Sequence, residues 1–279
     1  MNHQPRKRFG QNFLHDPQVI QRIVSCIAPR PDQSLIEIGP GQGAITLPLL
    51  QAAGRLTVVE LDRDLVGPLA ERCRNVGELH ILNQDALKLD FCALAPSGPS
   101  AALRIVGNLP YNISTPILFH LLKQAPCIRD MHFMLQKEVV ERMAAAPGTE
   151  AYGRLSVMIQ YRCRVEPLFH IGPGAFRPAP RVDSAFVRLL PLEQPAVQVR
   201  DEARFAEVVQ RAFAQRRKTL RNALKGLLDE TGFAAAGVDP GARGETLSLE
   251  QFAALSNEVR EQVPSPPAGG EGANRGTHP

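Results

Sequence analysis

Short apolar runs alternate with helix-compatible segments from about residue 33 onward. Five of the runs recur at spacings of about 20 to 30 residues, which is typical of repeated strand–helix–strand units. They lie at 34–39, 55–61, 78–85, 103–108 and 131–136. The pattern therefore predicts an α/β fold with a mostly parallel, doubly wound sheet.

Two later apolar runs, at 161–169 and 184–191, differ from these five in their connection. The segment before the second run contains "GPGAFRPAPRVD", which is too short and too rich in proline for a crossover helix. We therefore expect these two strands to form an antiparallel pair at one edge of the sheet.

The C-terminal third of the chain changes to helical periodicity. A linker is expected between Pro191 and Val199, and the apolar positions beyond it follow helical spacing. These positions are Phe205, Val208, Val209, Ala212 and Phe213. The final stretch has no apolar periodicity and is rich in proline and glycine. We expect an N-terminal arm and α/β domain over 1–192, a small all-helical domain over 193–263 and a disordered tail over 264–279.

Composition narrows the class of protein. The 279 residues contain no apolar run near the length of a membrane span and no N-terminal signal pattern, so we expect a cytoplasmic protein without membrane contact. The net charge is only +4, but basic residues gather at 6–8 and between 211 and 225. Five cysteines are scattered without any C-x-x-C pair, which favours buried free thiols over disulfides or zinc ligands. They are Cys26, Cys73, Cys92, Cys127 and Cys163.

A glycine-rich loop, "EIGPGQGAIT", follows the first predicted strand. Its glycines permit a tight turn and the close approach of a ligand. The dinucleotide-binding pattern needs its third glycine one position later, and the Glu37 carboxylate would repel a pyrophosphate. A nicotinamide-dependent oxidoreductase is therefore disfavoured, whereas a ligand with an ammonium or sulfonium group, S-adenosylmethionine, is favoured. A purely structural turn is the alternative.

Two further acids stand at the ends of the next two predicted strands. Glu60 is placed to accept hydrogen bonds from ribose hydroxyls, and Asp85 to accept one from the amine of an adenine. Either acid alone could be a solvated strand end. Their succession after the glycine loop makes a nucleoside-containing ligand the better interpretation.

The fourth apolar run leads directly into "NLPYNIS". Asn108 to Tyr111 would emerge at the carboxyl edge of the sheet, where α/β proteins bind ligands. An amide, a proline-fixed backbone and an aromatic ring together suit a flat heterocycle that carries an amino group. The alternative is an ordinary turn with a surface tyrosine.

Seven motifs, in order, resemble those of the ribosomal RNA adenine dimethyltransferases. They are "RKRFGQNFL" at 6–14, "EIGPGQG" at 37–43, "VVELD" at 58–62, "NQDAL" at 83–87, "VGNLPYNIS" at 106–114, "FRPAPRVDSAF" at 176–186 and "QRRKTLRNAL" at 215–224. The resemblance extends from about Arg6 to about Val263 and is closest to bacterial enzymes that dimethylate two adjacent adenosines in the hairpin near the 3′ end of 16S rRNA. One departure is Gly67-Pro68, which leaves the start of the helix after Asp64 open.

The resemblance implies a Rossmann-like class I methyltransferase fold, with S-adenosylmethionine as cofactor and no metal. The cofactor-binding residues would be Asn12, Leu14, Gly39, Glu60, Asp85 and Asn108. Asn108 and the Leu109 carbonyl would hold the target amine, Pro110 would fix the turn, and Tyr111 would stack on the purine. Phe176 is the expected second stacking ring, although it could instead be a core residue.

The resemblance also implies an RNA partner, 16S rRNA in the assembling small subunit, bound by a monomer. The expected RNA-binding residues are Arg177, Arg181, Arg211, Arg216, Arg217, Lys218 and Arg221. A solvated basic face is the simpler alternative for the helical residues. Two related functions stay open: a non-catalytic nucleic-acid-binding descendant of the fold, and a resistance methyltransferase of large-subunit rRNA.

Overall fold

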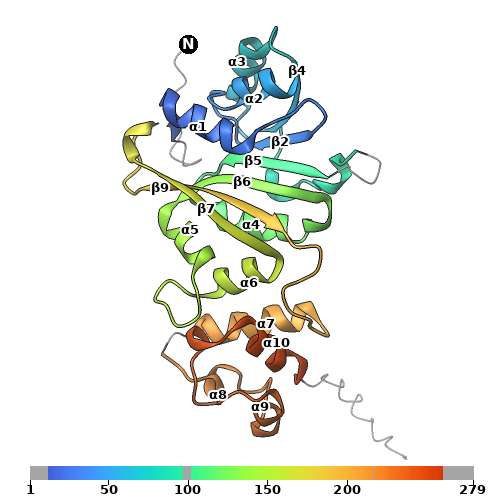
Figure 1. Ribbon diagram of the computed structural model, residues 1–279, viewed down its shortest axis with the longest axis vertical. Coiled ribbons are helices and arrows are strands. Elements are labelled where there is room, and N and C mark those ends of the chain that lie inside the picture. The colour runs from blue at the N-terminus through green and yellow to red at the C-terminus, as the bar shows by residue number, and fades with distance from the viewer. Residues whose placement is uncertain (1–11, 97–101, 216, 260–279) are drawn as a thin grey trace, which may run out of the picture.

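A seven-stranded sheet forms the centre of the computed structural model, which describes residues 12–96, 102–215 and 217–259 (Figure 1). Its strands are β2 (Ser34–Ile38), β3 (Arg55–Val59), β4 (Glu78–Leu82), β5 (Leu103–Asn108), β6 (Ile128–Gln136), β7 (Cys163–Ile171) and β9 (Ser184–Pro191). The strand order is β4-β3-β2-β5-β6-β9-β7. The first five are parallel, and β9 runs antiparallel to both β6 and β7. The predicted parallel sheet and its antiparallel edge pair are both confirmed.

The direction of winding reverses between β2 and β5. The chain first moves outward from β2 to β3 and β4, and then returns to place β5 on the other side of β2. At such a switch point the connections leave in opposite directions, so a crevice opens at the carboxyl ends of the strands. A separate two-stranded ribbon, β1 (Phe13–Leu14) with β8 (Phe176–Arg177), joins the N-terminal arm to the loop before β9.

Two layers of helices cover the sheet (Figure 1). One face carries α1 (Pro17–Ile27), α2 (Thr46–Ala53) and α3 (Arg63–Cys73), whose buried side chains share one apolar cluster with the sheet. The other face carries α4 (Ser114–Leu122), α5 (Lys137–Ala144) and α6 (Arg154–Arg162), which share a second cluster. The short 3₁₀ turns are η2 (Ala86–Lys88), η3 (Cys92–Leu94), η4 (Ala125–Cys127), η5 (Pro173–Ala175) and η6 (Gly244–Thr246).

Helix α3 resolves the question left by Gly67-Pro68. The helix begins at Arg63 and contains Pro68, so the proline does not stand at its first position. The Asp62 carboxylate caps the helix by accepting from the Asp64 N–H. Leu65 and Leu69 are both buried, and Leu69 shares an apolar cluster with Leu56 and Val58 of β3. This packing stabilises the helix despite the hydrogen bond that proline cannot make.

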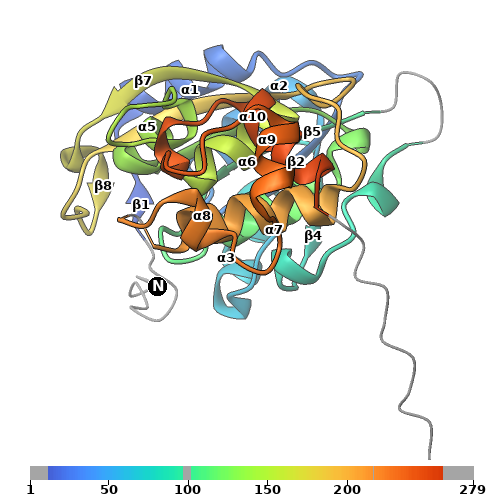
Figure 2. The same ribbon diagram turned by 90° about the horizontal axis from the view of Figure 1, so that it is seen from below.

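The C-terminal helices pack beneath α6 (Figures 1 and 2). They are α7 (Glu202–Ala214), α8 (Leu220–Ala223), α9 (Glu230–Ala236) and α10 (Leu249–Asn257). The predicted positions Phe205, Val208, Val209 and Ala212 are all buried. Their cluster also includes Tyr152, Val157 and Tyr161, which come from the segment around α6. The small helical unit is confirmed, whereas the boundary at 192/193 stays a prediction and the tail 264–279 lies outside the described residues.

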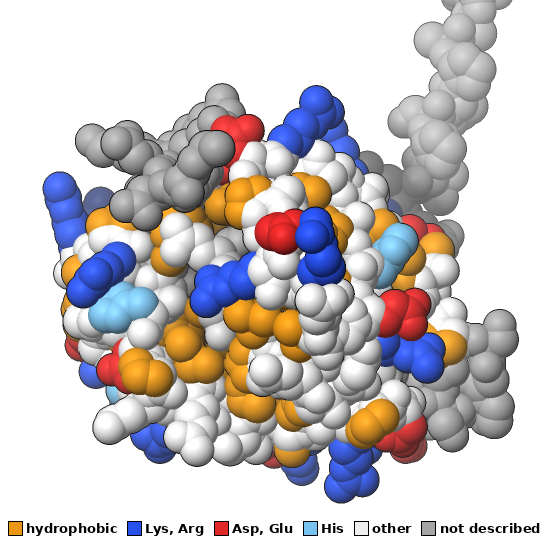
Figure 3. Space-filling model, turned by 90° about the horizontal axis from the view of Figure 1, so that it is seen from above, with side chains coloured by type: hydrophobic (Ala, Val, Ile, Leu, Met, Phe, Trp, Pro, Cys, Tyr) orange, Lys and Arg blue, Asp and Glu red, His pale blue; other side chains and the backbone are white. Residues whose placement is uncertain are grey.

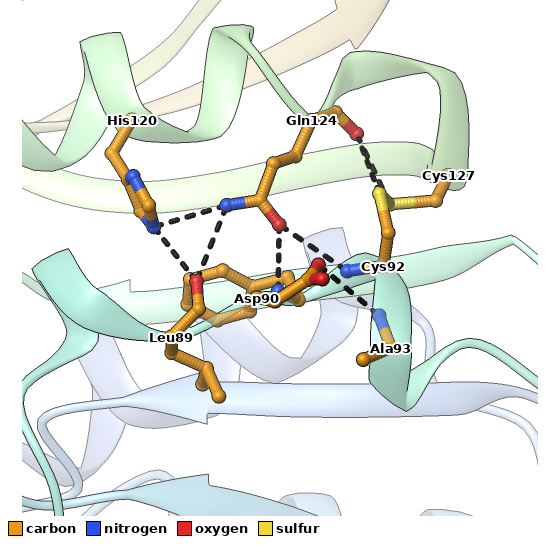
Figure 4. The surroundings of a disulfide bond; sticks show 8 residues. Leu89, Asp90, Cys92, Ala93, His120, Gln124 and Cys127 are labelled. Atoms are coloured by element: carbon orange, nitrogen blue, oxygen red, sulfur yellow. Dashed lines mark hydrogen bonds between the residues drawn. A yellow bond between two sulfur atoms is a disulfide. The ribbon is translucent and has the colours of Figure 1, made fainter.

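The expectation of free thiols is wrong for two cysteines. Cys92 and Cys127 form a disulfide, with sulfurs 2.11 Å apart and Cα atoms 5.5 Å apart (Figure 4). Cys26, Cys73 and Cys163 are free, and Cys26 is exposed rather than buried. The pairing has no signature in sequence spacing, because 35 positions separate the two residues and the fold brings η3 beside η4.

A buried ion pair ties the sheet together at the edge where β5 and β6 begin. Arg104 on β5 donates from Nε and Nη2 to the two carboxylate oxygens of Asp130 on β6, at 2.9 and 3.0 Å. Its remaining N–H groups donate to the Ile27 carbonyl and to the Gln33 side chain. These contacts fix the end of α1 against the sheet. Within the described ranges, no helix is long and apolar enough to cross a membrane.

Candidate active site

A cavity of about 310 Å³ lies at the carboxyl ends of β2, β3 and β5. Nine of the ten residues that the sequence suggested for cofactor and target binding line it, although they come from segments far apart in the chain. They are Asn12, Leu14, Gly39, Glu60, Asp85, Asn108, Leu109, Pro110 and Tyr111. The cavity occupies the crevice that the reversal of strand order creates.

Phe176 is the exception. Its side chain is 2% exposed and belongs to the apolar cluster of the α1–α3 face, with Phe169 and Phe186. It stands opposite Leu14 in the ribbon between β1 and β8. Phe176 is therefore a core residue in this structure and does not line the cavity. Its role as a stacking ring would need the loop to rearrange, and it stays a prediction.

The glycine loop wraps the floor of the cavity with left-handed backbone. Gly39, Gly41 and Gly43 have φ values of 68°, 57° and 82°, a region that other residues rarely adopt. A Cβ at Gly41 would lie 3.1 Å from the Phe13 ring, so glycine there also lets the N-terminal arm approach the loop. Helix α2 begins three residues after Gly43, at Thr46.

Glu60 holds the loop and keeps acceptor capacity for a ligand. Its Oε2 accepts from the Gly41 N–H at 3.2 Å, and its Oε1 accepts from the Asp62 N–H at 2.8 Å. Burial raises the pKa of Glu60 above its usual value, while these backbone N–H groups oppose the rise. Each oxygen retains a further lone pair, which suits the paired hydroxyls of a ribose.

Glu37 places a second carboxyl group in the same cavity. It is 1% exposed, and neither its Oε2 nor the Thr46 Oγ1 has a hydrogen-bond partner among the described residues. Burial raises the pKa of Glu37 to about 8, although the nearby Thr46 side chain opposes the rise, and the carboxyl group of Glu60 adds to it. A buried carboxyl group with an oxygen that has no hydrogen-bond partner suits a cationic ligand group. The residues present therefore fit S-adenosylmethionine, which carries an ammonium and a sulfonium.

Asp85 also lines the cavity, and it caps η2 by accepting from the Leu87 N–H at 2.9 Å. Its other oxygen has capacity for a ligand amine. Sequence reasoning missed the apolar lining, which includes Leu61, Ala86, Ile113 and Met134. The sequence signal for Leu61 was its place directly after Glu60. In the structure its side chain is 49% exposed. Apolar side chains that line a cavity offer a surface on which a flat ring can rest.

The N-terminal arm orients the amide of Asn108. Asn108 Nδ2 donates to the main-chain carbonyl of Asn12 at 2.9 Å. The Oδ1 end of the amide is thereby left as the acceptor, and no described residue donates to it. The Leu109 carbonyl likewise has no donor among the described residues, although Leu109 is only 1% exposed. The motif residues 6–11 lie outside the described residues, so only the end of the expected arm is seen.

The basic residues expected to bind RNA occupy two places. Arg177 and Arg181 are exposed on the loop before β9, whereas the others are on or near α7 and α8. Arg211 pairs with Glu207 and Arg221 with Glu230, but Arg217 and Lys218 are exposed and make no ion pair within the described ranges. Arg216 lies outside the described residues. On the face opposite the C-terminal helices, Lys and Arg are spread among apolar, acidic and neutral side chains (Figure 3).

The strand order, the glycine loop and the three acids of the cavity define an S-adenosylmethionine-dependent methyltransferase with a Rossmann-like sheet. Within the described ranges, no group of three or more His, Cys, Asp or Glu could hold a metal ion.

Comparison with known proteins narrows this class. The model of the family described as ribosomal RNA adenine dimethylase matches residues 2–261. The chain is 58% identical over 264 residues to ribosomal RNA small subunit methyltransferase A of Chromohalobacter salexigens, covering 94% of each chain. It is 56% identical over 259 residues to the protein of that name from Pseudomonas aeruginosa, covering 93% of this chain and 96% of the relative. The chain therefore belongs to the ribosomal RNA adenine dimethylase family.

Solved structures agree on the fold. A dimethyladenosine transferase from Plasmodium falciparum superposes with a TM-score of 0.72 at 23% identity, over 87% of this chain and 95% of that one. The 23S rRNA methyltransferase ErmE superposes with a TM-score of 0.67 at 27% identity, over 89% and 99%.

The Glu37 carboxyl predicts proton release on cofactor binding. In the ligand-free protein it keeps its proton up to a pKa of about 8, whereas a bound cation favours the carboxylate. We expect S-adenosylmethionine affinity to rise between about pH 6 and 7.5, where the ligand's amino group stays charged. Calorimetry in buffers of different ionisation enthalpy measures the released proton. Glu37→Gln should bind more weakly and release none, and equal release by both proteins would contradict the assignment.

The same substitution should have the opposite effect on stability. Because the folded-state pKa of Glu37 is raised from 4.5 to about 8, stability is lost as the pH rises through this range. Glu37→Gln removes that loss, so the ligand-free variant should have a higher Tm than the parent at a pH of about 8. If the difference in Tm between Glu37→Gln and the parent were the same at acidic and alkaline pH, the raised pKa of Glu37 would be contradicted.

Proposed function

We propose that this chain transfers methyl groups from S-adenosylmethionine to the N6 amines of two adjacent adenosines in the hairpin near the 3′ end of 16S rRNA. The motif resemblance and the relatives named small subunit methyltransferase A support this substrate. The enzyme would act as a monomer in the cytoplasm, on the assembling small ribosomal subunit.

One observation carries the proposal. Two carbonyl oxygens, Asn108 Oδ1 and the Leu109 main-chain O, belong to residues that line the cavity and have no donor among the described residues. An acceptor without a donor inside a binding cavity is available to a ligand. An exocyclic amine presents two hydrogens, one for each acceptor.

These two acceptors address the chemical difficulty of the reaction. The lone pair of an adenine amine is delocalised into the ring, so the amine is a weak nucleophile. Hydrogen bonds from both amine hydrogens would orient the nitrogen, so that its lone pair points out of the base plane. S-adenosylmethionine supplies the electrophilic methyl group when it is bound. The methylated amine is a cation acidic enough to lose its proton to water. The reaction therefore needs no general base, and the amide of Asn108 suffices at this position.

The turn after Asn108 would complete the base-binding pocket. The Ile113 N–H donates to the Pro110 carbonyl at 3.1 Å, which closes the turn and leads into α4. Tyr111 lies in this turn, lines the cavity and is half-buried. Its ring would stack on the flipped adenine, and Phe176 would contribute a second wall only after a loop rearrangement.

The exposed basic residues would hold the RNA backbone. Arg217 and Lys218 are available to phosphates at once, whereas Arg211 and Arg221 would exchange glutamate partners for phosphate. Arg177 and Arg181 follow Phe176 on the loop before β9 and would contact RNA closer to the cavity.

Methylation of small subunits that lack the modification tests the function. With labelled S-adenosylmethionine we expect dimethyladenosine at two adjacent positions of the 3′ hairpin, mapped by mass spectrometry of rRNA fragments. Asn108→Ala should lower the single-turnover rate at saturating cofactor by about a hundredfold or more, as loss of a preorganised hydrogen-bonding group does. Label in 23S rRNA would favour the large-subunit alternative, and RNA binding without any methylation would favour a non-catalytic role.

The salt dependence of RNA binding tests the helical domain. The double variant Arg217→Ala/Lys218→Ala should bind the rRNA more weakly and reduce the log–log salt slope by about 1.5 to 2, because two phosphate contacts no longer release counterions. Cofactor affinity should be unchanged. A matched control is Arg55→Ala/Arg129→Ala, which removes two exposed cations from the strand ends opposite the cavity. Equal slopes in both double variants would exclude residues 217 and 218 from the RNA surface.

A further inference from the structure

The hydroxyl of Ser184 forms a hydrogen bond with the hydroxyl of Tyr111, a residue that lines the cavity. Ser184 Oγ and Tyr111 Oη are 2.5 Å apart, although 73 positions separate the residues. Ser184 is fully buried and does not itself line the cavity. We propose that Ser184 is a positioning residue, which holds the Tyr111 ring in the plane needed for base stacking. This inference rests on the proposed function, in which Tyr111 contacts the target adenine.

The backbone of Ser184 is a rigid support. It begins β9, where it lies opposite Gln136 at the end of β6 and Ile171 at the end of β7. The preceding Asp183 carbonyl accepts from the Lys137 N–H at 2.9 Å. The strand that carries the Ser184 hydroxyl is therefore held by a neighbouring strand on each side, whereas Tyr111 lies in a turn.

The hydrogen bond restrains the ring where packing leaves freedom. The second side-chain torsion of a tyrosine is broad, so a ring that faces a cavity on one side can tilt. Burial raises the pKa of the Tyr111 phenol, so the hydroxyl stays protonated and available for the bond. The bond at the far end of the ring limits its tilt. It also explains a tyrosine at 111 instead of phenylalanine, which would leave the buried Ser184 hydroxyl without a partner.

The position of Ser184 also connects the target pocket to the RNA-facing loop. The residue directly follows the loop that carries Arg177 and Arg181. RNA bound to this loop would act on the start of β9, and through the Ser184 hydroxyl on the ring of Tyr111. The target base would thus stack on the Tyr111 ring, and the segment that holds this ring would also contact the RNA.

Single-turnover methylation at saturating cofactor tests the role. Ser184→Ala should slow methyl transfer about tenfold, which is the loss expected for one such hydrogen bond. Tyr111→Phe should be equally slow, and the double variant no slower than either, because all three lack the same bond. Ser184→Cys, whose thiol is larger than the hydroxyl and a weak hydrogen-bonding group, should also be slow. Ser256→Ala is the matched control, since it removes another buried serine hydroxyl, bonded to the Ala253 carbonyl in α10.

Two readouts separate positioning from folding. Cofactor affinity should stay at the parent value in Ser184→Ala, since Ser184 does not line the cavity. A variant that melts earlier but methylates at the parent rate would overturn the positioning role. Additive slowing in the double variant would also overturn it. A parent protein that forms no dimethyladenosine would instead refute the proposed function.

The disulfide carries a second, independent inference. Cys92 and Cys127 are half-buried, and they join the segment after Asp85 to the segment after α4 (Figure 4). The Gln124 side chain holds the same two segments without covalent help. Its Oε1 accepts from the N–H groups of Phe91 and Cys92 at 2.6 and 3.2 Å, and its Nε2 donates to the Leu89 carbonyl at 3.3 Å. Breaking the disulfide therefore leaves the segments in place.

We infer that Cys92–Cys127 is a site of reversible thiol–disulfide exchange in the folded protein. A dithiol reductant transfers two electrons and two protons, so the Sγ–Sγ bond breaks, two thiols form and the reductant becomes a disulfide. The main-chain carbonyl oxygen of Gln124 lies 3.1 Å from Cys127 Sγ and 3.6 Å from Cys92 Sγ. It is therefore within reach of both thiols as a hydrogen-bond acceptor. Each redox state therefore has satisfied partners in the same backbone arrangement.

Alkylation under denaturing conditions followed by mass spectrometry tests this site. The air-purified chain should show three alkylated cysteines, and after native treatment with dithiothreitol all five. Native reduction should lower Tm by about 5 to 10 °C, and oxidised glutathione should restore it. The double variant Cys92→Ser/Cys127→Ser should have the lower Tm with or without reductant. Five alkylated cysteines before reduction, or a bond that dithiothreitol reaches only in denaturant, would overturn the inference.

Discussion

The close approach of β2 and β5 is the constraint on which the site depends. A Cβ at Gly107 would lie 2.6 Å from the Ile38 carbonyl, so only glycine permits the pairing of Ile38 with Gly107. The two strands then end side by side and their connections leave in opposite directions. Gly39 and Asn108, the residues that follow this pair, are thereby brought to one crevice. The glycine loop and the turn after β5 line the same cavity because this pair of strands has no room for a side chain.

The cavity combines apolar walls with carboxyl groups that are costly to bury. Glu37 Oε2 has no hydrogen-bond partner among the described residues. The carboxylate of Glu60 accepts from the N–H groups of Gly41 and Asp62 and has lone pairs left for a ligand. Such groups oppose folding at neutral pH and are retained where a ligand completes them. At the other end of the sheet, Arg104 and Asp130 are equally buried but fully paired. Paired buried charges therefore stabilise one end of the sheet, whereas the carboxyl groups in the cavity keep acceptor oxygens without a partner.

Segments distant in sequence set the orientation of the residues in the turn after β5. The arm contributes the Asn12 carbonyl to the amide of Asn108, and β9 contributes the Ser184 hydroxyl to the ring of Tyr111. The ribbon of β1 with β8 connects the arm to the loop before β9. The amide and the ring are therefore oriented by elements that themselves contact each other, which is the arrangement a preorganised site requires.

The sequence by itself determined the sheet, its antiparallel edge and the helical C-terminal unit, because these follow from apolar periodicity. It also indicated nine residues of the cavity. Seven of them stand in motifs at strand ends, whereas Asn12 and Leu14 were implied only by the family resemblance. The sequence missed, or left open, features that depend on packing between distant segments. Cys92 and Cys127 carry no spacing signal, Phe176 is turned into the core by its pairing beside Leu14, and Pro68 stands inside a helix that the sheet stabilises. The hydrogen bond between Tyr111 and Ser184 could not be predicted either, because 73 positions separate the two residues. Local patterns specify which elements form, but only the tertiary structure decides which side chains meet across them.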